Sequence, residues 1–455
     1  MGKAGCGLSP EPGVHDIGPG VGDLVMKPAD RSTRDAGTCR TSAGRREPTG
    51  VSWLFAVSHR PFFLGASLLA ALSVPLWLAA HLGGMEEIMG MPARDWHVRE
   101  MLFGFLQAVI GGYLLSATPN WSGRLPASGW RLAGLFGLWA ICRLPFDLAA
   151  SDNVAISVCL FSLDLCFPLT CTSLLLREAR RRAPRQTWLA IFVFAGFGLC
   201  GAAYALNARL EGALLAPLAV SPPWVGIGFA LFLIALVGGR LVPSLTRSAL
   251  QPGLKDRVAP VDGSLDRLAI VGLPGAALVL AVGGQGLAAA TAVLAVGFLH
   301  LWRLVRWRGW LLRSPEVLAL HLAYGWLGVS LLLAGWSLMP GASIVPDAGL
   351  HAATVGAIGG MTMAVMGRLA MSRSLARGLP HVHQHRLFLL ALVLLHLSAL
   401  LRIAAAAGMG LSAFDRGPSL IAAAAAWSLA WTCLAVVLCL GALGGKGKQA
   451  GDRRG

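Results

Sequence analysis

Charged side chains are scarce in this chain. They make up 13% of its 455 residues, whereas hydrophobic residues make up 55%. A soluble domain carries roughly 25% charged residues. So little charge excludes a large water-facing surface, and with it a separate soluble catalytic domain. Any chemistry must therefore lie between apolar helices or in the short loops at their ends.

A motif built from closely paired cysteines is also absent. None of the nine cysteines belongs to a Cys-x-x-Cys pair, and most of them lie within apolar stretches. We interpret them as small buried hydrophobes. Metal or redox use of a pair such as Cys159 and Cys166 is the alternative.

The chain has instead twelve apolar blocks of about twenty residues each, the length that crosses a hydrocarbon core of ~30 Å. They predict an all-α integral membrane protein with about twelve transmembrane helices, in one domain over residues 51–444. The blocks lie at residues 61–82, 101–118, 131–150, 153–176, 187–207, 223–243, 267–283, 286–303, 317–338, 350–370, 387–407 and 419–443.

The basic residues predict the orientation of these helices, because cytoplasmic loops carry an excess of Lys and Arg. With the N and C termini both cytoplasmic, the outer loops hold only Arg94, Arg99, Arg209 and Arg416. The inner loops hold twenty: Arg124, Arg131, Arg177, Arg180, Arg181, Arg182, Arg185, Arg240, Arg247, Lys255, Arg257, Arg267, Arg303, Arg306, Arg308, Arg313, Arg368, Arg373, Arg377 and Arg386. This bias explains the net charge of +16 without a nucleic-acid partner. The partner it implies is the lipid bilayer.

The two ends of the chain differ from the apolar blocks. Residues 1–50 are rich in Gly, Pro, Arg and Asp, and we expect a disordered basic N-terminal tail there. No apolar stretch precedes a small-residue cleavage site, so we do not expect a secretory signal peptide. A translation start placed too far upstream, with Met26 as the true start, is an equal alternative. Residues 445–455 are predicted to form a short basic C-terminal tail.

A Gly-Arg-Leu sequence recurs every four predicted helices, at the inner ends of the second, sixth and tenth. Three copies of a four-helix unit would give this spacing, because membrane proteins often contain internal repeats. The alternative is that Gly-Arg is simply common at cytoplasmic helix ends. The three copies are Gly123-Arg124-Leu125, Gly239-Arg240-Leu241 and Gly367-Arg368-Leu369.

Five longer motifs stand at the ends of the predicted helices. They are Arg60-Pro61-Phe62-Phe63, Trp96-His97-Val98-Arg99-Glu100-Met101-Leu102-Phe103-Gly104, Thr118-Pro119-Asn120-Trp121-Ser122-Gly123, Gly238-Gly239-Arg240-Leu241-Val242-Pro243 with Thr246-Arg247, and His351-Ala352-Ala353-Thr354-Val355-Gly356-Ala357-Ile358-Gly359-Gly360-Met361-Thr362. In content, order and place among the helices, this set resembles the NnrS family over about residues 53–443.

The resemblance implies a multipass protein of the bacterial inner membrane that contains haem and copper. It implies protection of the cell against nitric oxide and nitrosative stress, with nitric oxide or a nitrosylated small molecule as partner. A homo-oligomer is left open. No Cys-x-x-Cys-His haem motif occurs in the chain.

Two positions depart from the family pattern. The pattern at the second helix is close to His-x-His-Glu-Met, and Arg99 stands here in place of its second histidine. The segment Met371-Ser372-Arg373-Ser374-Leu375 stands where the family often has Gly-His-Thr-Gly-Arg. A cofactor that uses either histidine in relatives is therefore absent from this member or ligated differently.

The remaining histidines supply candidate ligands, because haem iron and copper both accept neutral imidazole. The topology places His97 and His351 at a similar depth near the outer face, and we predict that this pair binds the cofactor and metal. Glu100 is predicted as a further metal-site residue, which either contacts the metal or orients His97. The alternative for Glu100 is a carboxylate favoured by the dipole of the helix start.

Two residues of the eleventh predicted helix complete the candidate cofactor site. His396 lies mid-membrane, where a polar group is costly, and we predict it as a single axial ligand. Arg402 lies in the outer half and is predicted to bind haem propionates, which the arginine fork recognises well. A salt bridge from Arg402 to Glu100 or Asp147 is the alternative.

Other polar residues have less specific interpretations. His300 and His321 form an alternative ligand pair near the inner face. The segment His381–His385 is predicted to be a solvated inner loop. Arg143 and Asp164, on helices joined by a short turn, are predicted to form a buried ion pair that offsets the cost of each charge in lipid.

The leading functional hypothesis is a haem- and copper-containing membrane protein of nitric oxide defence. Two other classes remain open. A secondary transporter would need a polar mid-membrane site on broken helices. A nitric oxide reductase related to haem-copper oxidases would also have twelve helices, but such enzymes usually use adjacent histidines, and no His-His pair occurs here. The sequence does not decide whether the protein is an enzyme.

Overall fold

The computed structural model describes residues 51–122, 127–144, 154–180, 183–210, 214, 217, 220–261, 263–342, 346–375, 382–407 and 416–443. Both predicted tails lie outside these residues, as does Asp147. The expectations for those segments therefore stay predictions.

The described chain is almost entirely helical. Its elements are α1 (Val51–Leu54), α2 (His59–Leu82), β1 (Glu87–Ile88), β2 (Met91–Pro92), α3 (Ala93–Val98), η2 (Arg99–Phe105), α4 (Leu106–Ser122), α5 (Trp130–Ile141), α6 (Val154–Ala179), α7 (Arg185–Arg209), α8 (Pro222–Leu233), η5 (Ile234–Gly238), α9 (Gly239–Ala249), η6 (Pro252–Arg257), α10 (Ser264–Ala281), α11 (Leu287–Arg306), η7 (Gly309–Leu311), α12 (Pro315–Ser337), α13 (Pro346–His351), η8 (Ala352–Gly359), α14 (Gly360–Leu375), α15 (Val382–Ala407) and α16 (Arg416–Leu443).

The helical blocks confirm the prediction of an all-α multipass membrane protein. Eleven helices in the described residues are long and apolar enough to cross a membrane, and the third block forms the shorter Trp130–Ile141. Helices are the expected form of these blocks because each backbone polar group in hydrocarbon must be bonded within its own segment. The predicted orientation of the termini stays a prediction.

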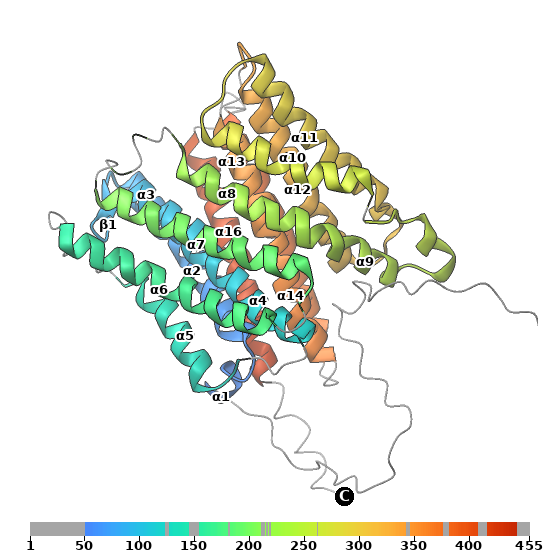
Figure 1. Ribbon diagram of the computed structural model, residues 1–455, viewed down its shortest axis with the longest axis horizontal. Helices are drawn as coiled ribbons and strands as arrows, with labels where there is room; N and C mark the ends of the chain where they lie inside the picture. The colour runs from blue at the N-terminus through green and yellow to red at the C-terminus, as the bar shows by residue number, and fades with distance from the viewer. Residues whose placement is uncertain are drawn as a thin grey trace, which may run out of the picture. The chain divides into compact units, whose positions relative to one another are not determined.

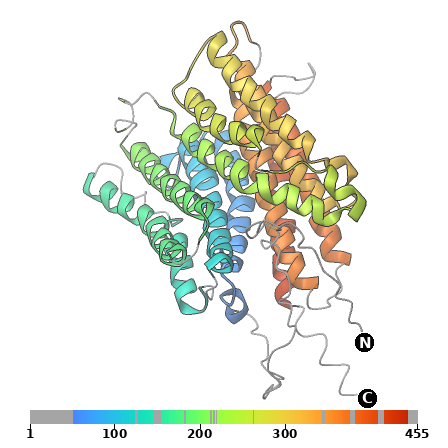
Figure 2. The same cartoon turned by 45° about the vertical axis from the view of Figure 1, so that its right-hand side comes forward.

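The last helix of the membrane domain, α16, packs against its first long helix, α2. In both views, α5 and α6 lie on one side of the helical region and α10 and α11 on the other, with α2, α4, α14 and α16 between them (Figures 1 and 2). Helix α16 packs against both α15 and α2. The indole N–H of Trp427 on α16 donates a hydrogen bond to the carbonyl of Ala70 on α2, at 2.9 Å. The start and end of the membrane domain are therefore joined directly.

Three membrane helices in the described part of the chain contain a π-helical segment. The segments η2, η5 and η8 interrupt the second, sixth and tenth predicted helices, the same three that carry the Gly-Arg-Leu recurrence. A π-helical turn holds one extra residue and is frequent at functional sites. This shared position is a second likeness among these three helices, in addition to the repeated tripeptide, and the four-helix repeat stays a prediction.

The carbonyls of these π-helical segments accept hydrogen bonds from side chains. Trp139 donates to Gly104 in η2 at 3.0 Å, and Arg303 donates to Ala235 in η5 at 2.9 Å. Thr362 donates to Ile358 in η8 at 2.8 Å. Side chains thus supply hydrogen bonds where the regular α-helical ladder is interrupted.

Two predicted helix ends were wrong. The sixth helix was expected to end at Pro243 but continues through α9 to Ala249, so the tripeptide Gly239-Arg240-Leu241 lies inside it. The extension is amphipathic, with Val242 and Leu245 buried, which explains how it persists beyond the apolar block. The tripeptide at Gly367 also lies inside a helix, because α14 extends to Leu375.

Many of the arginines assigned to loops lie within helices instead, and three of these have buried side chains. Arg99 and Arg209, predicted in outer loops, are buried in helices, with side chains 7% and 3% exposed. Arg303, predicted in an inner loop, is buried within α11 and pairs with Asp266. Buried ion pairs therefore account for part of the basic residues that a loop count alone would assign to the membrane surface.

A buried cluster of charges joins four membrane segments. The carboxylate of Asp164 on α6 lies 3.0 Å from the guanidinium groups of both Arg99 and Arg209. Glu100 lies 3.2 Å from Arg99 and 3.0 Å from Arg143, which follows α5. The predicted pair of Arg143 and Asp164 is present at 3.9 Å, as one contact of this larger network.

Removal of one carboxylate from this cluster should destabilise the fold. The substitution Asp164→Asn leaves Arg99 and Arg209 buried without its charge, and breaking a buried ion pair in this way costs ~3–5 kcal/mol. We expect a lower thermal unfolding temperature for the protein in detergent. Asp256→Asn, at an exposed position in η6, is the matched control and should unfold like the wild type. Equal unfolding temperatures for all three proteins would contradict a stabilising role for the cluster.

Candidate functional site

A small hairpin leads the chain into the candidate site. Strands β1 and β2 pair antiparallel, with Ile88 opposite Met91. Met89 and Gly90 between them have φ angles of 55° and 76°, the positive values that a two-residue type I′ turn requires. Ile88 and Met91 are buried together with Trp96, one residue before His97. The sequence analysis missed this hairpin, which anchors the start of α3.

His97 lies beside an aromatic ring from α2. The centroid of its imidazole is 4.6 Å from the Trp77 ring, and His81 stacks on Trp77 at 5.1 Å with 9° between the planes. Tyr204 of α7 donates a hydrogen bond to Asp95, two residues before His97, at 2.6 Å. Nδ1 of His97 is buried and has no hydrogen-bond partner in the described residues. A ring nitrogen of this histidine is therefore available to a ligand.

His351 is held in a defined tautomer. Its Nδ1 lies 2.8 Å from the backbone carbonyl of Asp347, one helical turn earlier. A carbonyl can only accept, so Nδ1 carries the proton and Nε2 keeps its lone pair. A hydrogen bond of this kind is the usual support of a metal-binding histidine. The side chain is half-buried at the start of the tenth predicted helix.

The structure brings three of the predicted site residues together. His97 interacts electrostatically with both His351 and Arg402. We call His97, His351 and Arg402 the outer cluster, after their predicted depth. Arg402 also interacts electrostatically with Asp347, but it makes no ion pair within 4 Å in the part of the chain that the structure describes. The cluster therefore combines two imidazoles with a half-buried cation that has no close counter-charge.

Glu100 forms ion pairs instead of standing alone. Its carboxylate contacts the guanidinium groups of Arg99 and Arg143 in the buried charge cluster. Gly104 makes room for this contact, because a Cβ atom there would lie 2.5 Å from Nη1 of Arg143. The prediction that Glu100 contributes to a metal site stays a prediction. Both of its oxygens are engaged by arginine in the structure.

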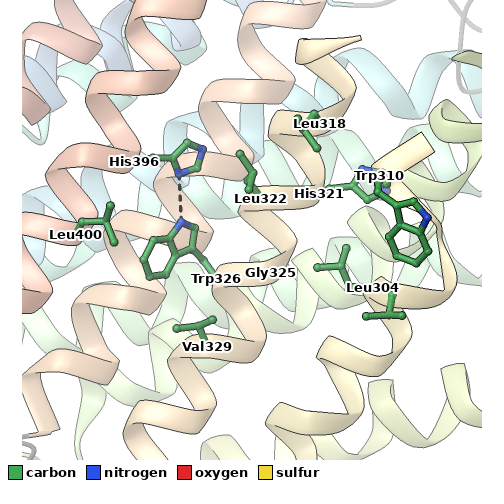
Figure 3. A pocket seen from close by; sticks show the side chains of 12 residues that line it. Leu304, Trp310, Leu318, His321, Leu322, Gly325, Trp326, Val329, His396 and Leu400 are labelled. Atoms are coloured by element: carbon green, nitrogen blue, oxygen red, sulfur yellow. Dashed lines mark hydrogen bonds between the residues drawn. The ribbon is translucent and has the colours of Figure 1, made fainter. Parts of the chain in front are cut away.

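His396 lines a cavity of about 640 Å³ between α11, α12 and α15, shown in Figure 3. The indole N–H of Trp326 donates to Nδ1 of His396 at 3.2 Å. Indole only donates, so Nδ1 accepts, and the neutral ring carries its proton on Nε2. In this arrangement Nε2 cannot bind a metal. The prediction of His396 as an axial ligand therefore requires Trp326 to release it first.

The two histidines of the alternative inner pair have separate partners. Nδ1 of His300 lies 2.9 Å from the hydroxyl of Tyr324, which also accepts a hydrogen bond from Arg303 at 2.7 Å. Nδ1 of His321 lies 3.1 Å from the carbonyl of Val317. Each ring is thus held by its own protein contacts, and no contact joins the two.

The predicted loop His381–His385 begins a helix instead. Helix α15 starts at Val382, and His385 in its first turn pairs with Glu316 of α12. His381 and the side chain of His383 lie outside the described residues. The helix begins earlier than expected because the ion pair with Glu316 stabilises its polar first turn. The polar residues of this segment had suggested a solvated loop.

The comparison with protein families agrees with this arrangement. The family model described as NnrS protein matches residues 53–440, which include the hairpin, the outer cluster and all three π-helical segments. The chain belongs to the NnrS family. No curated protein matches it. The earlier resemblance, drawn from motifs at the helix ends, is thus confirmed over most of the chain.

The outer cluster of this NnrS protein contains donor groups of the kinds that a haem would use. Imidazole is a ligand of haem iron, and the guanidinium of Arg402 suits a propionate. No group of three or more His, Cys, Asp or Glu side chains that could hold a metal ion occurs among the described residues. Haem and copper both stay expectations from the family resemblance.

The position of the missing family histidine lies in the charge cluster of this NnrS protein. Arg99 contacts Glu100 and Asp164 and donates to the carbonyl of Cys142 at 3.0 Å. An imidazole is shorter than arginine and cannot maintain all three contacts. We expect Arg99→His to lower the thermal unfolding temperature and to add no bound metal, measured by denaturation and elemental analysis. Added metal at unchanged stability would show that this position still forms a ligand site.

Proposed function

We propose that this protein is a haem-containing member of the NnrS family that protects a bacterial cell against nitric oxide from within its inner membrane. The observation that carries the proposal is the outer cluster. Two histidines from separate membrane helices interact electrostatically with an arginine that has no ion pair among the described residues. Buried polar groups of this kind are expensive in a membrane and are functional by default.

Each residue of the outer cluster has a role in this proposal. His351 would present Nε2, because Asp347 holds the proton on Nδ1. His97 would provide the second imidazole, with its ring orientation fixed by Trp77. Arg402 would bind a propionate, which needs a cation in a region that excludes water. A haem held by these residues would supply one-electron chemistry and an iron that can bind nitric oxide.

The residues around the cluster keep this geometry fixed. Tyr204 and the hairpin hold α3, while the charge cluster holds η2 directly after it. His97 therefore belongs to a segment that protein contacts hold on both sides. Copper, nitrosylated small molecules as partners, and a homo-oligomer remain parts of the family-based expectation that the outer cluster does not address.

The first test is the visible spectrum of the protein purified in detergent, with haem quantified against protein. We expect a Soret band in the wild type and its loss in both His97→Ala and His351→Ala. His81→Ala is the matched control, because His81 also contacts Trp77 but is exposed. A folded wild type without haem would overturn the proposal and favour the transporter alternative, which solute uptake in proteoliposomes would then examine.

The proposed role of Arg402 can be tested through the haem reduction potential. If its cation lies beside a propionate, Arg402→Leu should lower the haem reduction potential, because a nearby positive charge favours the reduced form. Arg402→Lys keeps the charge and should restore most of the potential. We would measure both by spectroelectrochemical titration. An unchanged potential in Arg402→Leu would place the arginine away from the haem.

Protection and catalysis are separated by two further measurements. Cells that express the protein should grow better under a nitric oxide donor than cells that express His351→Ala. Loss of nitric oxide from solution, followed with an electrode in the presence of an electron donor, reports whether the purified protein consumes the gas. Growth protection without consumption would identify a non-catalytic protector, and consumption would identify a reductase.

A further inference from the structure

A second cavity lies where the three helices with π-helical segments meet. Its volume is about 100 Å³. One wall comes from α4, the second from α8, η5 and α9, and the third from η8 and α14. The cavity thus lies between the second, sixth and tenth predicted helices. It shares no lining residue with the cavity that His396 lines.

Two of the π-helical segments border this cavity directly, and the third ends one residue before it. Ile234 and Gly238 of η5 line it, as does Ile358 of η8, and Leu106 follows η2 immediately. The extra residue of a π-helical turn displaces the side chains that follow from regular α-helical packing. Such turns at one junction leave a space that ridges and grooves of straight helices would fill. The cavity therefore follows from the geometry of these three helices.

The chemistry of the lining favours an apolar occupant. Nearly all of the lining atoms belong to aliphatic side chains, together with Met361. The hydroxyl of Thr362 is used by the carbonyls of Ile358 and Gly359 at 2.8 and 3.0 Å. The hydroxyl of Tyr113 is buried and has no hydrogen-bond partner among the residues that the structure describes. A buried water needs two to four polar partners, so the cavity does not provide a stable water site.

We propose that this cavity binds one small, neutral, apolar molecule of the size of a diatomic gas. A dry apolar cavity of roughly 150 Å³ in another protein binds xenon or benzene, so a cavity of about 100 Å³ suits a gas atom or a diatomic molecule. Such a gas dissolves in hydrocarbon and reaches the helices from the bilayer without an aqueous channel. The inference stands without the haem proposal, because no lining residue belongs to the outer cluster.

Xenon is the probe for this site, because it has the required size and apolarity and scatters X-rays anomalously. Crystals of the wild type pressurised with xenon should show one ordered xenon atom between α4, η5 and α14. Xenon dissolved in lipid or detergent stays disordered and gives no peak. Ordered water bonded to Tyr113, a lipid chain in the cavity, or the absence of xenon from it would each overturn the proposal.

Substitutions at one lining position test occupancy in both directions. Val109 of α4 lines the cavity and is buried. Val109→Phe should fill the space and abolish the xenon peak, whereas Val109→Ala should enlarge the space and raise the occupancy. The enlarging variant keeps the test decisive if the filling variant does not fold. Unchanged xenon occupancy in Val109→Ala would count against the site.

Two control variants separate the cavity from general effects. Val393→Phe changes a side chain of α15 that is 65% exposed, and it should leave the xenon peak unchanged. Tyr113→Phe removes the unpaired hydroxyl but keeps the ring, so xenon should still bind. Loss of xenon in Tyr113→Phe would show that the site depends on the hydroxyl and takes a polar ligand.

Discussion

The need to satisfy backbone carbonyls inside a hydrocarbon layer governs this structure. A π-helical turn interrupts the regular ladder of hydrogen bonds, and lipid offers no water as a substitute. Each of the three π-helical segments has a carbonyl that accepts a side-chain hydrogen bond, from Trp139, Arg303 or Thr362. Two of these donors come from other helices, so the interrupted ladders become links between helices.

One of these links restricts the sequence closely. The guanidinium of Arg303 reaches Ala235 only because Gly239 has no side chain, since a Cβ there would lie 2.5 Å from Nη2 of the arginine. Asp266 pairs with the same guanidinium and compensates its charge. The glycine and arginine of two different helices and the aspartate of a third thus form one unit. Its role is to support η5.

The sequence predicted the membrane class and the family, because these depend on composition and on motif order. Of its twelve predicted spans, eleven form helices long enough to cross a membrane among the described residues. It also predicted His97, His351 and Arg402 as site residues, and these three interact electrostatically in the structure. The burial of Arg99 could not be predicted. Hydrophobicity alone assigns an arginine next to an apolar block to the adjoining loop, and the buried carboxylates that pair with it are not visible in the sequence. The proton position on His396 could not be predicted either, because Trp326 lies 70 residues away in sequence.

The π-helical turns explain a further limit of sequence interpretation. One extra residue within an apolar block changes neither its length nor its hydrophobicity noticeably, so η2, η5 and η8 leave no signal in either. The hairpin before α3 also left no clear signal in the sequence. Its turn is Met89-Gly90, and methionine is not a typical residue at a positive φ angle. What decides these features is packing between segments far apart in the chain.

The segment η2 also changes how relatives should be aligned with this chain. Successive residues of an α-helix are turned by about 100° around its axis, so an extra residue shifts everything beyond it by that amount. A helical wheel drawn straight from Trp96 to Tyr113 therefore assigns one end to the wrong face. A relative with a single-residue deletion between Arg99 and Phe105 would keep an unbroken helix, yet its histidine would point in a different direction from His97. A one-residue gap inside one of these helices in an alignment therefore means that side chains beyond the gap point in a different direction, even where the aligned residues are identical.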